Sequence, residues 1–218
     1  MTTTMQSAPA EGPELTVVAP VFNEAGNVAP LVARLKPVLE TCVASFEILF
    51  VDDGSSDATL AAIKAENARD ARIRAVSFSR NFGKEIAIAA GLDHAAGRAV
   101  VIMDADLQHP PETIPVFVAR WREGYQNVYG QRTHREHDSA LRRMLSQRFY
   151  RLFRAFGETQ LPEGAGDFRL LDRRAVEALL TMRERARFSK GLYAWVGFRS
   201  LGVPFEGEER AHGESKYS

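Results

Sequence analysis

Apolar and polar residues alternate along the first half of the 218-residue chain in a way that separates strands from helices. Four short, continuous apolar runs rich in valine and isoleucine have the length of strands buried on both faces. They span residues 15–19, 46–51, 73–78 and 99–103. Helical patterns, with apolar residues three and four apart or a run of alanines, follow at residues 27–44, 56–68, 84–96 and 111–123. This alternation predicts a parallel sheet with helices on both faces.

Two of the predicted helices have recognisable first turns. Ser56 and Asp57 are capping candidates for the second helix, because their side-chain oxygens can accept hydrogen bonds from free N–H groups. Pro111 opens the fourth helix, at a position where its missing N–H does no harm.

The second half of the chain follows a different pattern. Residues 132–156 hold seven arginines against one Asp and one Glu, with leucine, methionine and phenylalanine at helical spacing. Beyond them the sequence predicts a glycine-rich joint at residues 163–173 and a short helix at 175–183. Short strands and loops are expected from residue 187 to residue 218.

Charge and cysteine content narrow the class of protein. The 28 Lys and Arg residues balance 28 Asp and Glu residues, so the net charge does not indicate a nucleic-acid partner. The single cysteine, Cys42, excludes an intramolecular disulfide and a multi-thiolate zinc site. No apolar run reaches the ~18 residues that cross a bilayer. Residues 1–14 are small and polar, which predicts a disordered tail rather than a signal peptide.

Polar side chains gather where each predicted strand ends. In an open parallel sheet these carboxyl ends lie at one edge, and ligands bind there at the point where strand order reverses. The four strand ends in turn carry Asn23 and Glu24; Asp52, Asp53 and Asp57; Arg80, Asn81 and Lys84; and Asp104, Asp106, Gln108 and His109. The sequence therefore predicts one polar ligand site at this edge.

The pair Asp104 and Asp106 indicates a metal ion. Carboxylates one residue apart on a turning backbone can both face one hard cation, and Mg²⁺ and Mn²⁺ favour oxygen ligands, including those of a substrate phosphate. Asp52 and Asp53 are better placed to accept hydrogen bonds from the base or ribose of a nucleoside. No glycine-rich dinucleotide fingerprint or P-loop follows the first strand, which argues against redox chemistry and P-loop hydrolysis.

Simpler interpretations exist for each motif taken alone. A single D-x-D is a weak signal, and Asp-Asp-Gly-Ser-Ser fits a turn followed by a helix cap. His109, directly before two prolines, fits a loop residue better than a metal ligand. The four polar strand ends in one chain favour a common site.

Five motifs occur in a fixed order along the chain: PVFNEAGNV, VDDGSSDAT, SRNFGKE, MDADLQHPPE and GDFRLLDR. In this order they resemble the family-2 inverting glycosyltransferases with a GT-A fold, over about residues 15–217. More narrowly, they resemble the polyprenyl-phosphate sugar transferases, namely dolichyl-phosphate mannose synthase and the bactoprenol glucosyltransferases. SRNFGKE looks closer to the bacterial glucosyl branch. The Q-x-x-R-W signature of processive polysaccharide synthases is absent from the sequence, so a long polymer product is not expected.

The resemblance implies a donor, an acceptor and a cofactor. The donor is UDP-glucose or a related UDP- or GDP-hexose, and the acceptor is undecaprenyl or dolichyl phosphate at the cytoplasmic face of the membrane. Mg²⁺ or Mn²⁺ is the implied cofactor, held by Asp104, Asp106 and Gln108. The nucleotide sugar is expected to contact Pro20, Val21, Asn23, Glu24, Asp52, Asp53, Lys84, Asp104, Ala105 and Asp106.

The acceptor phosphate is expected to meet arginine and lysine side chains. By motif position these are Arg132, Arg210 and Lys216, and bidentate arginine suits phosphate geometry. Asp167 lies where the family has a carboxylate near the acceptor, and we expect it to orient the acceptor or an arginine. The expected catalytic residues are thus Asp104, Asp106, Asp167 and Arg132. A surface role for Arg210 and Lys216 is the alternative.

The resemblance also predicts how the chain is organised. Residues 15–130 form the nucleotide-sugar-binding half, and residues 131–218 form the acceptor part of the same domain. The basic segment 132–156 has the composition of an interfacial helix on an anionic leaflet; a helix packed on the core with a solvated basic face is the alternative. Many family members carry transmembrane helices after a stretch like residues 212–217, and we expect these to be absent from this chain. Assembly into homo-oligomers is compatible with the resemblance.

Two other functions are compatible with the same motifs. One is a family-2 transferase that acts on a soluble or glycan acceptor. The other is a non-catalytic module that binds nucleotide sugars.

Overall fold

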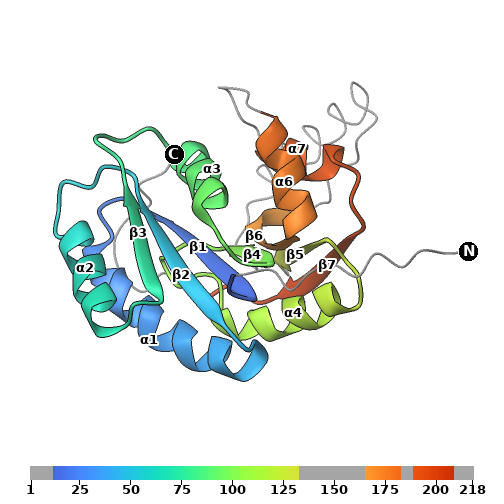
Figure 1. Cartoon of the computed structure of the whole chain (residues 1–218), viewed down its shortest axis with the longest axis horizontal. Coiled ribbons are helices and arrows are strands. Elements are labelled where there is room, and N and C mark those ends of the chain that lie inside the picture. Colours follow the sequence, from blue (N-terminus) through green and yellow to red (C-terminus); the bar gives the residue numbers. More distant parts are fainter. Residues whose placement is uncertain (1–11, 133–164, 183–188, 209–218) are drawn as a thin grey trace, which may run out of the picture.

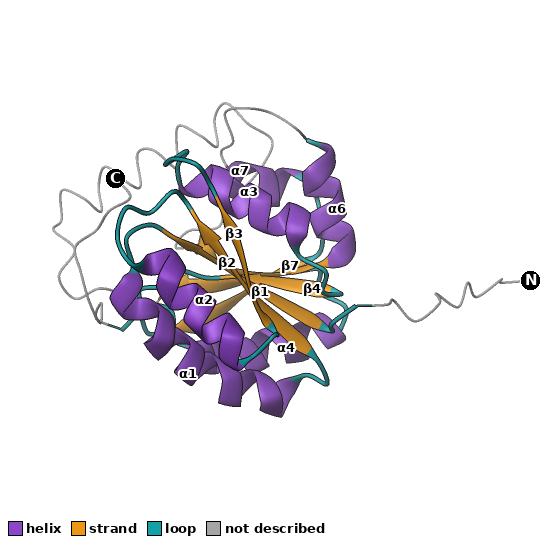
Figure 2. Ribbon diagram, turned by 60° about the vertical axis from the view of Figure 1, so that its left-hand side comes forward, coloured by secondary structure: helices purple, strands orange, loops and turns teal. Residues whose placement is uncertain are grey.

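The structure is a computed structural model that describes residues 12–132, 165–182 and 189–208. A seven-stranded sheet has the order β3-β2-β1-β4-β6-β5-β7 and lies between two layers of helices (Figures 1 and 2). The strands are β1 (Leu15–Val21), β2 (Phe46–Asp52), β3 (Ile73–Ser77), β4 (Ala99–Ile102), β5 (Asn127–Arg132), β6 (Ala165–Asp172) and β7 (Ser200–Phe205). Among these, β6 runs opposite to the others. The predicted α/β fold with a mostly parallel sheet is confirmed.

The apolar runs of the first half form strands as predicted. β1, β2 and β4 are buried along their whole length, since each has neighbours on both sides and helices on both faces. The expectation was wrong for the third run, because in the described part of the chain β3 is an edge strand, paired with β2 alone. Its Arg74, Ala75 and Ser77 are exposed.

The four predicted helices of the first half are present. They are α1 (Ala25–Cys42), α2 (Thr59–Arg69), α3 (Lys84–His94) and a 3₁₀ turn η1 (Pro111–Thr113) that continues into α4 (Ile114–Arg122). Of the two capping candidates, Asp57 accepts a hydrogen bond from the N–H of Thr59 at 2.9 Å. Ser56 instead lies in the preceding turn, where its own N–H donates to Asn23.

Two expectations for the second half were wrong. The supposed joint at residues 163–173 contains β6, which lies inside the sheet between β4 and β5. Phe168 and Leu170 of β6 pack into the core on one face of the sheet, and Leu171 packs on the other face. Within the region expected to hold only strands and loops, residues 189–195 form α7 (Ser189–Trp195), whose Tyr193 is buried. The predicted short helix is confirmed as α6 (Arg173–Thr181), capped by the Asp172 side chain.

Two parts of the sequence-based expectation lie outside the described residues. The basic segment 132–156 is described only at Arg132, and residues 1–11 of the expected tail are likewise not described. Within the described ranges, no helix combines the length and the apolar character needed to cross a bilayer.

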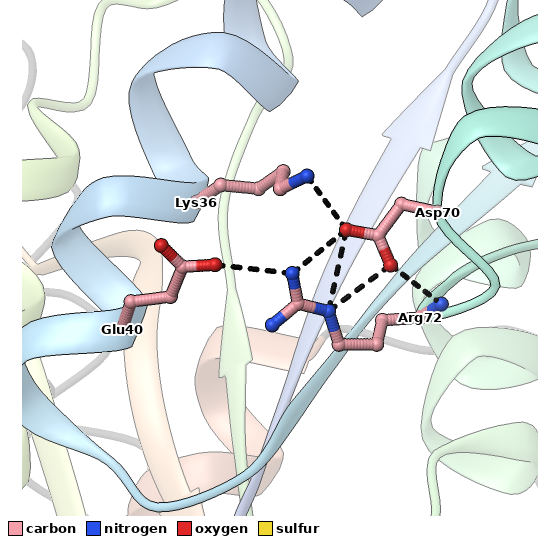
Figure 3. Close-up of polar contacts among 4 residues, drawn as sticks. All are labelled: Lys36, Glu40, Asp70 and Arg72. Carbon is pink, nitrogen blue, oxygen red and sulfur yellow. Dashed lines mark hydrogen bonds and ion pairs between the residues drawn. The ribbon is translucent and has the colours of Figure 1, made fainter.

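The helices divide between the two faces of the sheet. α1, α2 and α4 cover one face, and α3, α6 and α7 cover the other (Figure 1). An ion-pair cluster joins α1 to the turn between α2 and β3 (Figure 3). In it, Asp70 contacts Lys36 at 2.6 Å and Arg72 at 2.8 Å, and Arg72 also contacts Glu40 at 3.0 Å. The hydrogen bond from Arg72 is the main reason why the pKa of Asp70 is well below its ordinary value.

The reversed direction of β6 decides which of its residues lie at the edge of the sheet that carries the candidate site. The carboxyl ends of the other strands lie at the same edge as the amino end of β6. In the register, Ile102 of β4 pairs with Arg169 of β6. Asp104, just past β4, therefore comes beside Asp167, near the start of β6.

Candidate active site

Lys84 links two carboxylates that come from different strands. Its Nζ lies 2.6 Å from Oδ1 of Asp104 and 3.0 Å from Oδ2 of Asp167. Burial works against the charged ammonium, but the two carboxylates outweigh it and raise the pKa of Lys84 above its ordinary value. The structure therefore brings together three residues that the sequence had assigned to the donor, the metal and the acceptor.

Asp53 fixes the turn that presents Lys84. Its carboxylate accepts hydrogen bonds from the N–H groups of Phe82 at 2.7 Å and Gly83 at 3.0 Å. Gly83 precedes α3 with φ of 98°, a conformation that glycine adopts without strain. Lys84 is then the first residue of α3, and its side chain points back toward the edge of the sheet where Asp104 and Asp167 lie.

The neighbouring Asp52 has internal partners as well. It accepts from the N–H of Ser55 at 3.0 Å and from the hydroxyl of Ser77 at 2.8 Å. Asp52 and Asp53 are both buried, with 1% and 0% of their surface exposed. The structure thus gives both side chains a part in shaping the loops, and their contact with a nucleoside stays a prediction.

The loop after β1 is locked to the loop after β2. Asn23, with φ of 54°, accepts through Oδ1 from the N–H of Ser56 at 2.8 Å, and its own N–H donates to Oγ of Ser55 at 2.9 Å. The N–H of Glu24 donates to Oγ1 of Thr59 at 2.8 Å. These contacts hold the two loops predicted to bind the donor as one unit. Pro20 and Val21 lie beneath them, buried in β1 beside Val51 and Asp52.

His109 shapes the loop that carries the D-x-D motif. Its Nδ1 accepts a hydrogen bond from the N–H of Asp104 at 3.2 Å, and its ring stacks on Phe168 with centroids 4.8 Å apart. Desolvation lowers the pKa of His109, which favours the neutral ring that this hydrogen bond requires. The sequence predicted only that His109 is a loop residue, because no local pattern indicates that its imidazole stacks on Phe168.

The chemistry of the D-x-D loop fits a hard cation. Asp104 and Asp106 flank the buried Ala105, and Oδ1 of Asp106 accepts from the N–H of Gln108 at 3.0 Å. Carboxylate and amide oxygens are ligands that Mg²⁺ and Mn²⁺ accept. Within the described part of the chain, no three His, Cys, Asp or Glu side chains gather closely enough to hold a metal by themselves. These donors would therefore need further oxygens, such as those of a diphosphate.

The segment after β7 lies against the same loop. The N–H of Glu208 donates to the carbonyl of Gln108 at 3.2 Å. The guanidinium of Arg132, at the end of β5, lies over Gly207, where a Cβ atom would come within 2.3 Å of Nε. Arg132 thus lies against the segment that contacts the D-x-D loop, whereas Arg210 and Lys216 lie outside the described residues.

Arg34 of α1 holds the segment after β7 by an ion pair. Its guanidinium contacts Glu112 at 2.7 Å and Glu208 at 2.6 Å. One arginine of α1 therefore joins the turn after the D-x-D loop to the segment after β7. The sequence gave no signal for this contact, since the three residues are far apart in the chain.

Arg169 is a second residue whose role the sequence did not reveal. The side chain is buried, and its guanidinium lies 3.7 Å from the ring centroid of Tyr193. Its Nη2 donates to the carbonyl of Gly166 at 2.5 Å. Arg169 thereby holds the backbone next to Asp167, and burial lowers its pKa.

The fold and the position of these residues define the chain as a GT-A-type glycosyltransferase domain, with its carboxylates where the order of parallel strands reverses between β1 and β4. The family model described as glycosyl transferase family 2 matches residues 16–180. The chain belongs to this family.

Relatives of known sequence support the same assignment. An uncharacterized glycosyltransferase from Synechocystis is 44% identical over 205 residues, which cover 94% of this chain and 64% of the relative. A bactoprenol glucosyl transferase of Shigella phage SfV is 38% identical over 205 residues, covering 94% of this chain and 67% of the relative. The chain thus spans just under two thirds of the Synechocystis protein.

A solved structure confirms the fold. The mannosyltransferase PcManGT from Pyrobaculum calidifontis, in complex with GDP-Man and Mn²⁺, superposes with a TM-score of 0.62 at 22% identity. The match covers 88% of this chain and 55% of that one. The predicted GT-A architecture is therefore confirmed.

Proposed function

We propose that this chain transfers a hexose, with UDP-glucose as the preferred donor, to a polyprenyl phosphate such as undecaprenyl phosphate. The observation that carries the proposal is the 38% identity, over 94% of the chain, to a protein named bactoprenol glucosyl transferase. The site adds chemical support, because it combines carboxylates for a metal with cationic side chains at one edge of the sheet.

The donor half of the proposed reaction centres on the D-x-D loop. Asp104, Asp106 and Gln108 would hold Mg²⁺ or Mn²⁺, and a bound cation neutralises the charge of a diphosphate leaving group. A structural neighbour of the same fold, the mannosyltransferase from Pyrobaculum calidifontis, is in complex with Mn²⁺, which supports the choice of ion. The locked loops that carry Asn23 and Asp53 form the side of the site where the nucleoside is proposed to lie.

The acceptor half of the proposed reaction depends on charge rather than on a strong base. A lipid phosphate is already anionic at neutral pH, so the main difficulty is to bring it close to an anionic donor. Arg132 lies over Gly207, in the segment that contacts the D-x-D loop, and is proposed to hold the phosphate together with Arg210 and Lys216. Asp167 contacts Lys84, which fits a role in orienting charged groups.

A lipid acceptor implies contact with a membrane. We assign this contact to the basic segment 132–156, at the cytoplasmic face of the membrane. The acceptor part is proposed to comprise residues 131–218, and its strands β6 and β7 extend the sheet of the first half. A homo-oligomer is compatible with this arrangement.

Product analysis tests the proposal directly. The protein is incubated with undecaprenyl phosphate, Mn²⁺ or Mg²⁺, and radiolabelled UDP-glucose, GDP-mannose or UDP-N-acetylglucosamine in parallel. We expect label from UDP-glucose to enter the butanol phase, and the double change Asp104→Asn plus Asp106→Asn to abolish this transfer. Asp93→Asn, an exposed aspartate at the other end of α3, is the matched control. Labelled product confined to the aqueous phase would contradict a lipid acceptor.

A further inference from the structure

We propose that Lys84 is an internal cation that competes with the divalent metal for Asp104. In this arrangement the metal gains Asp104 only when Lys84 gives up its contact with Oδ1 and keeps its contact with Asp167. The inference rests on the proposed function, since it takes Asp104 as a metal ligand. It adds a role for a residue that the motif alone would assign to donor binding.

The distances make simultaneous binding unfavourable. The ammonium lies 2.6 Å from Oδ1 of Asp104, at full ion-pair contact. Mg²⁺ binds carboxylate oxygens at about 2.0–2.1 Å. A metal on the same carboxylate would therefore come within a few ångströms of a second positive charge, in a site where Lys84 is largely shielded from water.

The local structure allows Lys84 to change partners without a change of fold. Asp53 holds the backbone of Phe82 and Gly83, so the start of α3 is fixed while the lysine side chain is not part of that contact. A lysine side chain has a flexible four-carbon stem, which carries an ammonium group with three hydrogen-bond donors. Release of Asp104 leaves the 3.0 Å contact with Asp167 in place.

This competition couples the metal to the nucleotide. Metal alone must displace Lys84 from Asp104 and leave it with one carboxylate. A nucleotide diphosphate brings anionic oxygens that offset both cations, so metal and nucleotide strengthen each other's binding by the same factor. We therefore expect the protein to bind Mn²⁺ weakly by itself and much more tightly with UDP.

Mn²⁺ titration followed by electron paramagnetic resonance tests the competition without measuring activity. Lys84→Met removes the competing charge, and we expect its Kd for Mn²⁺ in the absence of nucleotide to fall about tenfold or more. The enhancement of Mn²⁺ binding by UDP should shrink by a similar factor. Lys84→Arg keeps the charge and should retain the weak binding of the wild-type protein.

Lys64→Met is the matched control for a general change in charge. Lys64 is an exposed lysine of α2, on the face of the sheet opposite α3, and the same change of Lys to Met removes one positive charge there. Its removal should change the Kd for Mn²⁺ less than twofold. An effect equal to that of Lys84→Met would overturn the direct competition.

Thermal denaturation provides a second measurement, which also serves if Lys84→Met is unstable. A ligand that binds only the folded state raises the melting temperature. Mn²⁺ alone should raise it more in Lys84→Met and Lys84→Gln than in the wild-type protein. Equal or smaller shifts in the variants overturn the inference.

Failure of this inference can be told apart from failure of the proposed function. Equal Mn²⁺ affinity in wild type and Lys84→Met, together with normal formation of glucosyl lipid, overturns only the competition. Intact competition without any lipid product overturns only the proposed acceptor. Absence of Mn²⁺ binding in all variants, with and without UDP, overturns both.

Discussion

The N–H of Asp104 donates a hydrogen bond to Nδ1 of His109 at 3.2 Å, so a ring from the core holds the first aspartate of the D-x-D loop. The ring is itself fixed by stacking on Phe168 and by an edge contact with Phe205. Core packing and the conformation of the D-x-D loop are therefore coupled through one imidazole.

His109→Phe keeps an aromatic ring on Phe168 but removes the acceptor for the N–H of Asp104. We expect it to lower the free energy of unfolding by about 1–3 kcal/mol, because the N–H is left unpaired, and to weaken metal-dependent donor binding. Urea denaturation and Mn²⁺ titration with UDP measure the two effects. His109→Asn restores an acceptor near the position of Nδ1 and should recover donor binding better than His109→Phe. Unchanged donor binding in His109→Phe would contradict the positioning role.

Asp53→Asn tests whether this carboxylate acts through the loop or on the nucleoside. The amide keeps one acceptor oxygen and turns an NH₂ group toward the N–H of Phe82 or Gly83, so the turn before Lys84 should loosen. We expect a loss of about 1–3 kcal/mol in unfolding free energy, with a parallel fall in kcat/KM. A raised KM for the donor at unchanged stability would instead indicate direct contact with the nucleoside.

Asp167→Asn separates orientation from base catalysis. Because Asp167 contacts Lys84 at 3.0 Å, we expect it to position charged groups rather than to accept a proton. Loss of a general base typically costs about 10²- to 10⁴-fold in rate, and the variant should lose less than the lower end of this range. The KM for UDP-glucose should stay near that of the wild type. A loss above 10³-fold, with disappearance of the acidic limb of the pH–rate profile, would identify a base.

Glu47 gives a prediction about acid stability at the edge opposite the site. Its buried carboxylate accepts from Oγ1 of Thr16 at 2.7 Å and from the N–H of Ala96 at 2.8 Å, and it pairs with Arg74 at 2.7 Å. Burial alone would raise the pKa of Glu47, but these contacts outweigh it and lower the pKa. Its stabilising contribution is therefore present above about pH 4.5, the ordinary value, and is lost as pH falls through the lowered pKa.

Glu47→Gln should accordingly be less stable than wild type at pH 7, by about 1–3 kcal/mol, and the difference should narrow as the pH falls below about 4. Urea denaturation at pH 3.5, 5 and 7 measures it. Glu123→Gln, at an exposed ion pair with Arg120 on the surface, is the control and should shift stability by less than about 1 kcal/mol. A constant difference across these pH values would show that the charge of Glu47 does not contribute.

The parts of the fold that the sequence predicted are those with continuous local patterns. β1, β2 and β4 were recognisable because strands buried on both faces form nearly continuous apolar runs. β6 was not, because Asp167 and Arg169 interrupt its apolar residues and Gly166 suggests a turn. The burial of Arg169 under Tyr193 depends on α7, a seven-residue helix that contains Gly191 and has too few turns to show a period.

The same reason explains what could be predicted about the site. That Asp104 and Asp106 lie at a strand end follows from the sequence near them. That Lys84 also reaches Asp167 depends on β6 entering the sheet in reverse, which no local pattern specifies. His109 likewise depends on packing partners distant in the sequence, such as Phe168, almost sixty residues later in the chain.

Gly207 gives a prediction about Arg132 and the acceptor. A Cβ atom at residue 207 would lie 2.3 Å from Nε of Arg132, so Gly207→Ala must push the guanidinium aside. The displaced group is the end of a flexible side chain, and we expect the unfolding free energy to change by less than about 1 kcal/mol. If Arg132 holds the acceptor phosphate, the KM for undecaprenyl phosphate should rise severalfold while that for UDP-glucose stays constant.

Gly26→Ala is the matched control for Gly207→Ala, because nothing lies within 4 Å of a Cβ atom at residue 26. Its kinetic constants should equal those of the wild type, and alanine in the first turn of α1 should leave stability equal or slightly higher. Arg132→Lys completes the series: it keeps the charge but loses the bidentate geometry, so it should raise the KM for the lipid as Gly207→Ala does. Equal KM values for the lipid in all three variants would remove Arg132 from the acceptor site, and the phosphate would then have to be held by other cationic side chains.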